Sequence, residues 1–137
     1  MNTSNIKKYA PQARNDFIAA MRKQAAKYGI TADSILPAEQ KGDLLLIGDQ
    51  VFPLSVMKPR DKLIKRIQTS SFEQTIDYIA YSWFNRLCAI RYMECKGLLD
   101  HGRRVLSSAD GSAGLPQILE ECLDIDLPGL DASRVAE

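Results

Sequence analysis

The strongest candidate for binding chemistry in this sequence is a run of cations in its middle. Five positive charges fall within nine residues, opposed only by Asp61: Lys58, Arg60, Lys62, Lys65 and Arg66. On a helix, Lys58, Lys62 and Lys65 recur at steps of four and three, away from the apolar residues of the same segment. Such a row can neutralise the phosphates of a nucleic-acid backbone without reading its bases. A solvated helix face gives the same pattern, so both interpretations stay open.

A second cluster surrounds the only tryptophan of the chain. Apolar residues recur there at helical steps in two rows: Phe72, Ile76, Ile79, Trp83, Leu87 and Ile90 in the first, and Tyr81, Phe84, Cys88, Tyr92 and Cys95 in the second. We expect the central helix of a small domain, covered on both sides, with its aromatic side chains in the core. Arg91 and Glu94 are three residues apart and can pair along this helix. The alternative is a docking surface, and the candidate core or docking residues are Trp83, Phe84, Arg86, Arg91 and Glu94.

Three ordered stretches carry a resemblance to a known family: residues 1–17 (MNTSNIKKYAPQARNDF), residues 83–94 (WFNRLCAIRYME) and residues 99–102 (LDHG). Together they resemble the N-terminal region of the adenine-specific DNA methyltransferases of BREX phage-exclusion systems. Matches in the same order are far more specific than one short motif. The resemblance implies a large bacterial enzyme that transfers a methyl group from S-adenosylmethionine to adenine N6. It also implies, as partners, the remainder of the methyltransferase, the backbone of duplex DNA and other BREX components.

The catalytic parts that this resemblance implies are missing from the sequence. Amino methyltransferases hold a flipped-out base with an Asn-Pro-Pro-Tyr or Asp-Pro-Pro-Tyr loop, and the chain has no Pro-Pro pair. Their glycine-rich cofactor turn follows a strand, whereas the nearest stretch here, Gly111 to Gly114, follows no convincing strand. We therefore expect no catalytic residue, no cofactor in this chain and no methyl transfer by it alone. The expected role is scaffolding, DNA-backbone contact or partner docking; the alternative is a protein-protein interaction module without a nucleic-acid role.

The spacing of cysteine and histidine argues against a metal site. Cys88, Cys95, His101 and Cys122 are separated by 7, 6 and 21 residues, without the tight pair of ligands that structural zinc uses. We expect Cys88 and Cys95 to be small buried hydrophobic residues and the thiols to be reduced, as in an intracellular protein. His101 lies in an Asp-His-Gly turn, where a capping or surface role is expected.

Composition indicates a soluble, cytoplasmic protein without a membrane partner, and the resemblance implies that the cytoplasm is bacterial. The 137 residues are 45% apolar, and no apolar run is long enough to cross a membrane. The net charge of +1 conceals an asymmetry, because residues 1–106 carry 17 Lys or Arg against 10 Asp or Glu, while residues 107–137 carry one against seven. This split predicts a basic helical domain over 1–106, a Gly/Ser linker over 107–115 and an acidic, truncated segment over 116–137.

The pattern of elements predicts a mainly α-helical fold. We expect helices from Pro11 to about Tyr28, from Pro59 to about Gln68, and from Ser70 or Ser71 to Gly97. A short acidic helix is expected over 116–123, and residues 131–137 are typical of a first helical turn that does not continue.

One short β-hairpin is also predicted, near residues 43–54. Its two apolar runs flank Gly48-Asp49, a two-residue turn that hairpins favour. Pro53 keeps the second strand at an edge of the sheet, because proline cannot donate to a ladder. Residues 31–42 are expected to be an irregular connection.

Overall fold

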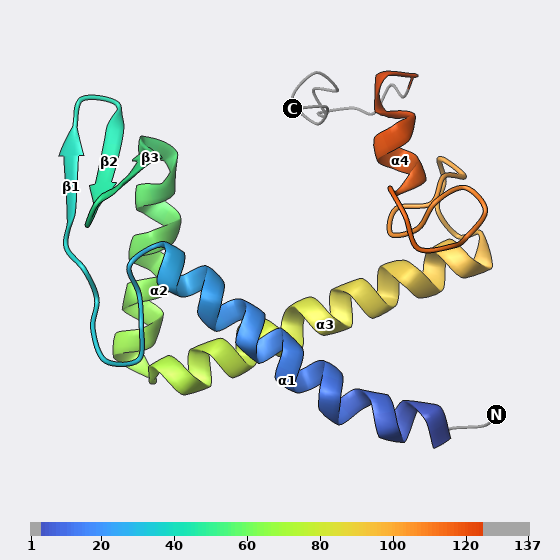
Figure 1. Ribbon diagram of the computed structural model, residues 1–137, viewed down its shortest axis with the longest axis horizontal. Helices are drawn as coiled ribbons and strands as arrows, with labels where there is room; N and C mark the ends of the chain where they lie inside the picture. Colours follow the sequence, from blue (N-terminus) through green and yellow to red (C-terminus); the bar gives the residue numbers. More distant parts are fainter. Residues whose placement is uncertain (1–3, 125–137) are drawn as a thin grey trace. The chain divides into compact units, whose positions relative to one another are not determined.

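The computed structural model describes residues 4–124 and has the predicted fold class, mainly α-helical with a small antiparallel sheet. The chain forms two compact units: an N-terminal unit over Met1–Phe84 and a C-terminal unit over Asn85–Glu137. The predicted ending over 131–137 lies outside the described residues. The elements (Figure 1) are α1 (Ser4–Lys27), β1 (Ala38–Lys41), β2 (Leu44–Ile47), β3 (Gln50–Pro53), the 3-10 turn η1 (Leu54–Val56), α2 (Met57–Thr69), α3 (Phe72–Lys96), α4 (Gln117–Glu120) and the 3-10 turn η2 (Cys122–Asp124).

Helix α1 begins at Ser4, so the predicted start at Pro11 is wrong and the proline lies inside the helix. An interior proline removes one backbone donor, but its fixed φ is itself compatible with helical backbone. The predicted end is confirmed, because Gly29 adopts a φ of 71°. The Ile30 amide donates to the Ala25 carbonyl (3.0 Å) and the Gly29 amide to the Ala26 carbonyl (2.9 Å). These two bonds form a Schellman ending.

The predicted hairpin is confirmed as β2 and β3, and a third strand extends it. The sheet order is β1-β2-β3, all antiparallel, so β3 with Pro53 is an edge strand as expected. The prediction of an irregular connection over residues 31–42 is wrong at β1. All four residues of β1 are exposed, so the alternation of apolar and polar residues that reveals a strand is absent there.

Two apolar clusters make the core of the N-terminal unit. The first consists of the buried residues Ala25, Ile30, Phe72 and Ile76, and α2 packs Leu63, Ile64 and Ile67 against it. The second joins the sheet to the end of α1 through Leu45, Ile47 and Phe52, with Tyr28 against them. The Tyr28 and Phe52 rings are 5.1 Å apart between centroids.

Both ends of α3 follow the predicted local signals. The Ser71 hydroxyl accepts the Gln74 amide at 3.1 Å, which is an N-cap bond. At the other end Gly97 adopts a φ of 66°, and the Leu98 amide donates to the Met93 carbonyl at 2.8 Å. The short acidic helix expected after Pro116 is present as α4, followed by η2.

The exposure of α3 corrects the expectation of a helix covered on two sides. The first row is buried at Phe72 and Ile76, but Trp83 is 46% exposed. Of the second row, Tyr81 is 68% and Tyr92 61% exposed. Phe84 is half-buried and meets Phe17 of α1 edge to face, with centroids 5.6 Å apart. Periodicity therefore identified an apolar face without showing what covers it.

The cysteines differ from expectation as well. Cys88 and Cys95 are exposed and only Cys122 is buried, so the prediction of two buried thiols on α3 is wrong. The ring of His101 accepts the Arg103 amide at Nδ1 (3.1 Å), which is the capping role expected of it. Within residues 4–124 no three His, Cys, Asp or Glu side chains are grouped to hold a metal ion. None of the helices in that range has the length and apolarity to span a bilayer.

Candidate functional surfaces

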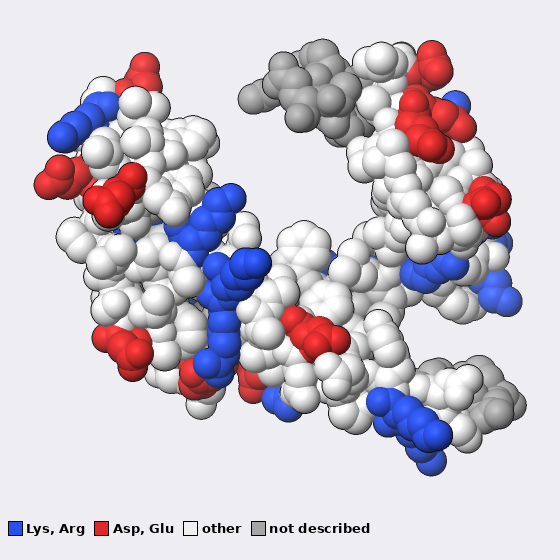
Figure 2. Space-filling model, viewed as in Figure 1, with Lys and Arg blue, Asp and Glu red and all other residues white. Residues whose placement is uncertain are grey.

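The cations of α2 form the first candidate surface. Lys58, Lys62 and Lys65 are exposed on this helix, and none of the three forms an ion pair with another residue between 4 and 124. We call these three residues the lysine row. In Figure 2, Lys and Arg side chains gather on one face of the N-terminal unit, mainly over the second half of α1. Long, unpaired cations of this kind are suited to a polyanion and carry no base specificity.

Arg66 lies at the end of this row but has a partner of its own. Its guanidinium carbon sits 3.8 Å from the centroid of the Tyr78 ring on α3. A guanidinium over an aromatic face is a favourable cation-π contact. Arg66 is therefore held in place, which links α2 to α3 within the N-terminal unit.

Arg60 was predicted to be one of the exposed phosphate-binding cations of α2, and this prediction is wrong. The residue is only 6% exposed. Its Nε donates to the Tyr28 carbonyl at 2.9 Å, and its Nη2 donates to the Leu36 carbonyl. A cation at the carbonyl end of a helix is favourable, so Arg60 closes the end of α1. The sequence did contain the signal, since Arg60 precedes Leu63, Ile64 and Ile67 by three, four and seven residues and so shares their inward face.

The second candidate surface is the second apolar row of α3. Its members Tyr81, Cys88, Tyr92 and Cys95 are exposed, whereas Phe84 is half-buried. Of the other residues proposed for docking, Trp83 and Arg86 are exposed as well. A helix normally turns such a row toward a neighbouring element. Among the described residues, therefore, this row has the composition of an interface but is largely uncovered.

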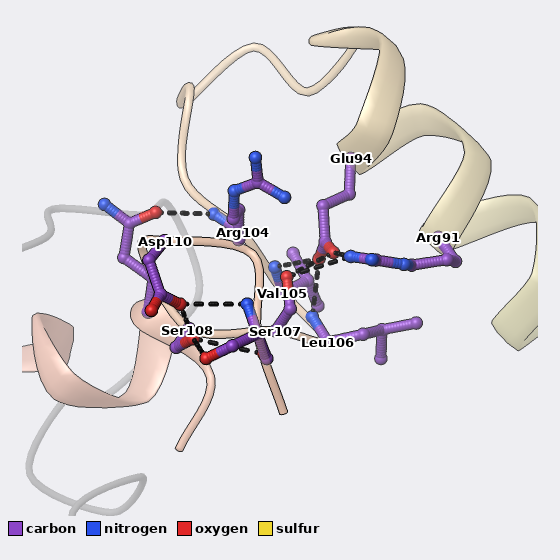
Figure 3. A network of polar contacts seen from close by, with 10 residues as sticks. Arg91, Glu94, Arg104, Val105, Leu106, Ser107, Ser108 and Asp110 are labelled. Carbon is purple, nitrogen blue, oxygen red and sulfur yellow. Dashed lines mark hydrogen bonds and ion pairs between the residues drawn. The ribbon is translucent and has the colours of Figure 1, made fainter. Parts of the chain in front are cut away.

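Glu94 is the centre of a polar network in the C-terminal unit (Figure 3). Its side chain has no exposed area and pairs with Arg91, which confirms the predicted pair. The carboxylate also accepts the Ser107 hydroxyl at 2.6 Å and the amides of Val105 and Leu106 at 2.7 Å each. Arg91 in turn donates to the Ser107 hydroxyl at 2.9 Å. The sequence predicted the ion pair along α3 but not the three partners from the following loop.

This network fixes the charge of Glu94. Burial raises the pKa of the carboxyl, but the hydrogen bonds from Leu106, Ser107, Arg91 and Val105 outweigh it and lower the pKa to about 2. A buried carboxylate that is fully hydrogen-bonded remains ionised at neutral pH. Glu94 is therefore a structural anion that ties the loop after α3 to the helix.

The residues of the predicted Gly/Ser linker, 107–115, form hydrogen bonds of their own. Asp110 accepts the Ser108 hydroxyl and the Ser112 amide, the latter at 2.9 Å. These bonds, with the Ser112 hydroxyl, lower the pKa of Asp110 to about 2. Further along, Gln117 accepts the Arg104 amide at 3.0 Å. Residues 107–115 thus contain several hydrogen-bonded turns.

The cofactor expected of the parent family finds no matching turn in these residues. A nucleotide-type cofactor needs a glycine turn directly after a strand. Gly111 to Gly114 instead lies within turns that follow α3, and the Gly111 Cα faces the Arg104 guanidinium, whose Nη1 would lie 3.0 Å from an added Cβ. The described residues therefore do not fit S-adenosylmethionine.

Comparison with known proteins points to one enzyme class. No protein-family model matches the chain. It is 51% identical over 112 residues to the adenine-specific methyltransferase BrxX of Escherichia coli O9:H4 (strain HS), a match that covers 78% of this chain and 9% of the relative. It is 30% identical over 138 aligned positions to the adenine-specific methyltransferase PglX of Lacticaseibacillus casei (strain Zhang), covering 92% and 11%. The chain thus spans about a tenth of the length of these relatives, and the predicted resemblance to a region of the BREX adenine-specific methyltransferases is confirmed.

Proposed function

We propose that this chain is the N-terminal, non-catalytic segment of a methyltransferase that transfers methyl groups from S-adenosylmethionine to adenine N6 in bacterial defence against phage. Support comes from the two relatives, both named adenine-specific methyltransferases, of which the chain matches only a small part. The described residues contain no cofactor turn, so methyl transfer is the work of other parts of the enzyme. The compartment of such an enzyme is the bacterial cytoplasm.

The role that the geometry supports best is docking against the rest of the methyltransferase. The observation that carries this proposal is the second apolar row of α3, on which Tyr81 and Tyr92 are each more than 60% exposed. Exposed aromatic side chains on a regular helix are typical of an interface. The relatives are roughly ten times longer than the region matched, so a large body of the same polypeptide is available to cover them.

This docking role is tested in the complete methyltransferase that contains the segment. Tyr81→Ser and Tyr92→Ser, introduced together, are expected to lower DNA methylation by about tenfold or more, since truncating an aromatic residue at the centre of an interface costs about 1 to 2 kcal/mol or more. The matched control is Tyr9→Ser, because Tyr9 on α1 is 62% exposed and lies outside the row. Equal activity of the double variant, the control and the unchanged enzyme would contradict docking through this row.

A second role, contact with the DNA backbone, is favoured by the lysine row. Lys58, Lys62 and Lys65 are exposed and form no ion pair within residues 4–124. Binding of duplex DNA by the full chain would then be weak, independent of sequence and steeply dependent on salt. The competing possibility is an interaction module without a nucleic-acid role.

The salt dependence of duplex binding separates these two possibilities. Lys62→Glu with Lys65→Glu is expected to reduce the slope of log affinity against log salt by about one for each lysine removed. Lys41→Glu serves as the control, because Lys41 is an exposed lysine on β1, away from α2. Unchanged affinity in the Lys62 and Lys65 variant would remove DNA contact from the proposal and leave docking.

A further inference from the structure

A polar cavity of about 430 Å³ lies in the C-terminal unit, between the end of α3 and the turns that follow it. This volume is within the range for small-ligand sites, about 300 to 1,000 Å³. Leu99 brings the only large apolar side chain among the described residues of its wall. The wall also includes Glu94, Gly97, Arg103, Arg104, Ala109 and Gln117.

Arg104 brings to this wall a charge that no described neighbour neutralises. Its guanidinium forms no hydrogen bond, ion pair or cation-π contact within residues 4–124. Each of the other arginines in that range makes at least one side-chain interaction. Arg104 is half-buried, and an arginine that is partly removed from water normally finds acceptors for its five donors.

The backbone of Arg104 is fixed although its guanidinium is not. The amide donates to the Gln117 side-chain oxygen, and the carbonyl accepts the Ile118 amide, each at 3.0 Å. Gly111 lies against the guanidinium, whose Nη1 would be 3.0 Å from a Cβ added there. Figure 3 shows the guanidinium pointing away from the Glu94 carboxylate, under the chain segment that leaves α3. Arg104 is therefore held at the cavity with its side-chain donors unused.

The other charged groups of the wall already have partners. Glu94 is paired with Arg91, and Arg103 with Glu121. The carbonyl end of α3 opposes an anion, but two of its carbonyls accept the amides that follow the helix. The unbalanced charge of the cavity is that of Arg104, so the wall favours an anion.

We propose that this cavity binds a sugar phosphate, with the phosphate on the Arg104 guanidinium and the sugar hydroxyls against the polar wall. The planar fork of an arginine matches two oxygens of a phosphate. The cavity is larger than a bare ion, and its polar wall suits a hydroxylated body better than an aliphatic one. The same chemistry is offered by a free sugar phosphate and by the sugar-phosphate backbone of a nucleic acid. The proposal does not rest on the methyltransferase assignment.

The test is an NMR titration of the full 137-residue chain labelled with nitrogen-15. The probes are ribose 5-phosphate, ribose without the phosphate, and a short DNA duplex. We expect saturable shifts of the Gly102 and Ala109 amides and of the Arg104 Nε-H signal with ribose 5-phosphate or with the duplex. Ribose alone is expected to leave these signals in place, because it lacks the anion that Arg104 recognises. Whichever phosphate probe saturates identifies the source of the ligand.

Substitution of Arg104 provides the second measurement. Arg104→Gln removes the charge and should weaken binding about tenfold or more, while unchanged Val105 and Leu106 amide signals show that the Glu94 network is intact. Arg104→Lys keeps the charge without the fork and should also bind more weakly than the unchanged chain.

Lys96→Gln is the matched control. Lys96 is exposed at the end of α3 and outside the cavity wall, so this variant loses the same charge from the same unit and should bind like the unchanged chain. The proposal is overturned if neither phosphate probe saturates by about 10 mM, if ribose shifts the same signals equally, or if Arg104→Gln and Lys96→Gln bind with equal affinity.

Discussion

Ile76 in the N-terminal unit and Glu94 in the C-terminal unit lie on the same helix and are both buried, at 1% and 7% exposure, but in unlike surroundings. Ile76 packs among Ala25, Ile30 and Phe72, so its contribution comes from apolar area removed from water. Glu94 is surrounded by the donors of Arg91, Val105, Leu106 and Ser107, so its contribution comes from charge-assisted hydrogen bonds.

Residues of α3 are thus stabilised in two different ways, by apolar packing near its start and by a hydrogen-bonded carboxylate near its end. Apolar packing is insensitive to the protonation of any one group and depends on shape. A hydrogen-bonded carboxylate depends on its charge and on each of its donors. Changes of packing, charge, pH and backbone freedom should therefore affect the two units differently.

The largest effect is expected from Ile76→Ala. Removing three carbons from this cluster should lower the free energy of unfolding by about 3 to 4 kcal/mol. Denaturant unfolding followed by circular dichroism measures the change. Val51→Ala is the control, because Val51 is 58% exposed on β3, and a loss below about 0.5 kcal/mol is expected there. Similar losses in the two variants would show that this cluster is not the core of the N-terminal unit.

Glu94→Gln should have a smaller effect that is confined to the C-terminal unit. The amide group places a donor against donors, so a loss of about 2 to 3 kcal/mol in local stability is expected. In hydrogen exchange, the Val105 and Leu106 amides should lose protection, whereas the protection of the Phe52 and Ile76 amides should not change. Glu73→Gln is the control, since Glu73 pairs with Arg22 at the surface. Protected Val105 and Leu106 amides in Glu94→Gln would refute the network.

Acid should reproduce the effect of that substitution reversibly. The pKa of Glu94 is lowered from 4.5 to about 2 in the folded chain. The stabilisation, about 3 kcal/mol, is fully present above pH 4.5 and is lost as the pH falls toward 2. An NMR titration of the Val105 and Leu106 amides should show a transition in this range, which Glu94→Gln removes. A midpoint close to 4.5 would mean that the donors do not hold the carboxylate.

The smallest expected effect is the difference in unfolding free energy between alanine substitutions at Gly29 and at Gly97. Gly29 and Gly97 end α1 and α3 with φ of 71° and 66°, so alanine is strained by about 1 kcal/mol at either position. At Gly29 the new Cβ would also meet the Ile47 side chain at 2.6 Å, whereas at Gly97 it meets nothing within 4 Å. Gly29→Ala should therefore cost about 1 to 2 kcal/mol more than Gly97→Ala in denaturant unfolding. Equal losses of unfolding free energy in the two variants would show that the Ile47 side chain can move aside for the added methyl group.

The sequence predicted the features that depend on a few neighbouring residues. The glycine endings at Gly29 and Gly97, the Ser71 cap, the hairpin turn at Gly48 and the Arg91–Glu94 pair are all set by short-range geometry. They were found because each type of turn or cap demands particular residues within one or two turns of chain. Strand β1 was not predicted because all four of its residues are exposed and its only apolar residue is Ala38, so no alternating apolar pattern marks it.

The tertiary structure decided what lies against each side chain. From the sequence, Arg60 was predicted to be one more surface cation. In the folded chain it donates to the carbonyls of Tyr28, at the end of α1, and Leu36, in the connection that follows. The second apolar row of α3 was predicted to be core, but the structure shows most of it exposed. Glu94 accepts hydrogen bonds from the loop because the chain turns back toward the helix after α3. Periodicity fixes the side of a helix on which a residue lies, because the helical repeat is local; burial depends on elements distant in sequence, and only folding brings those together.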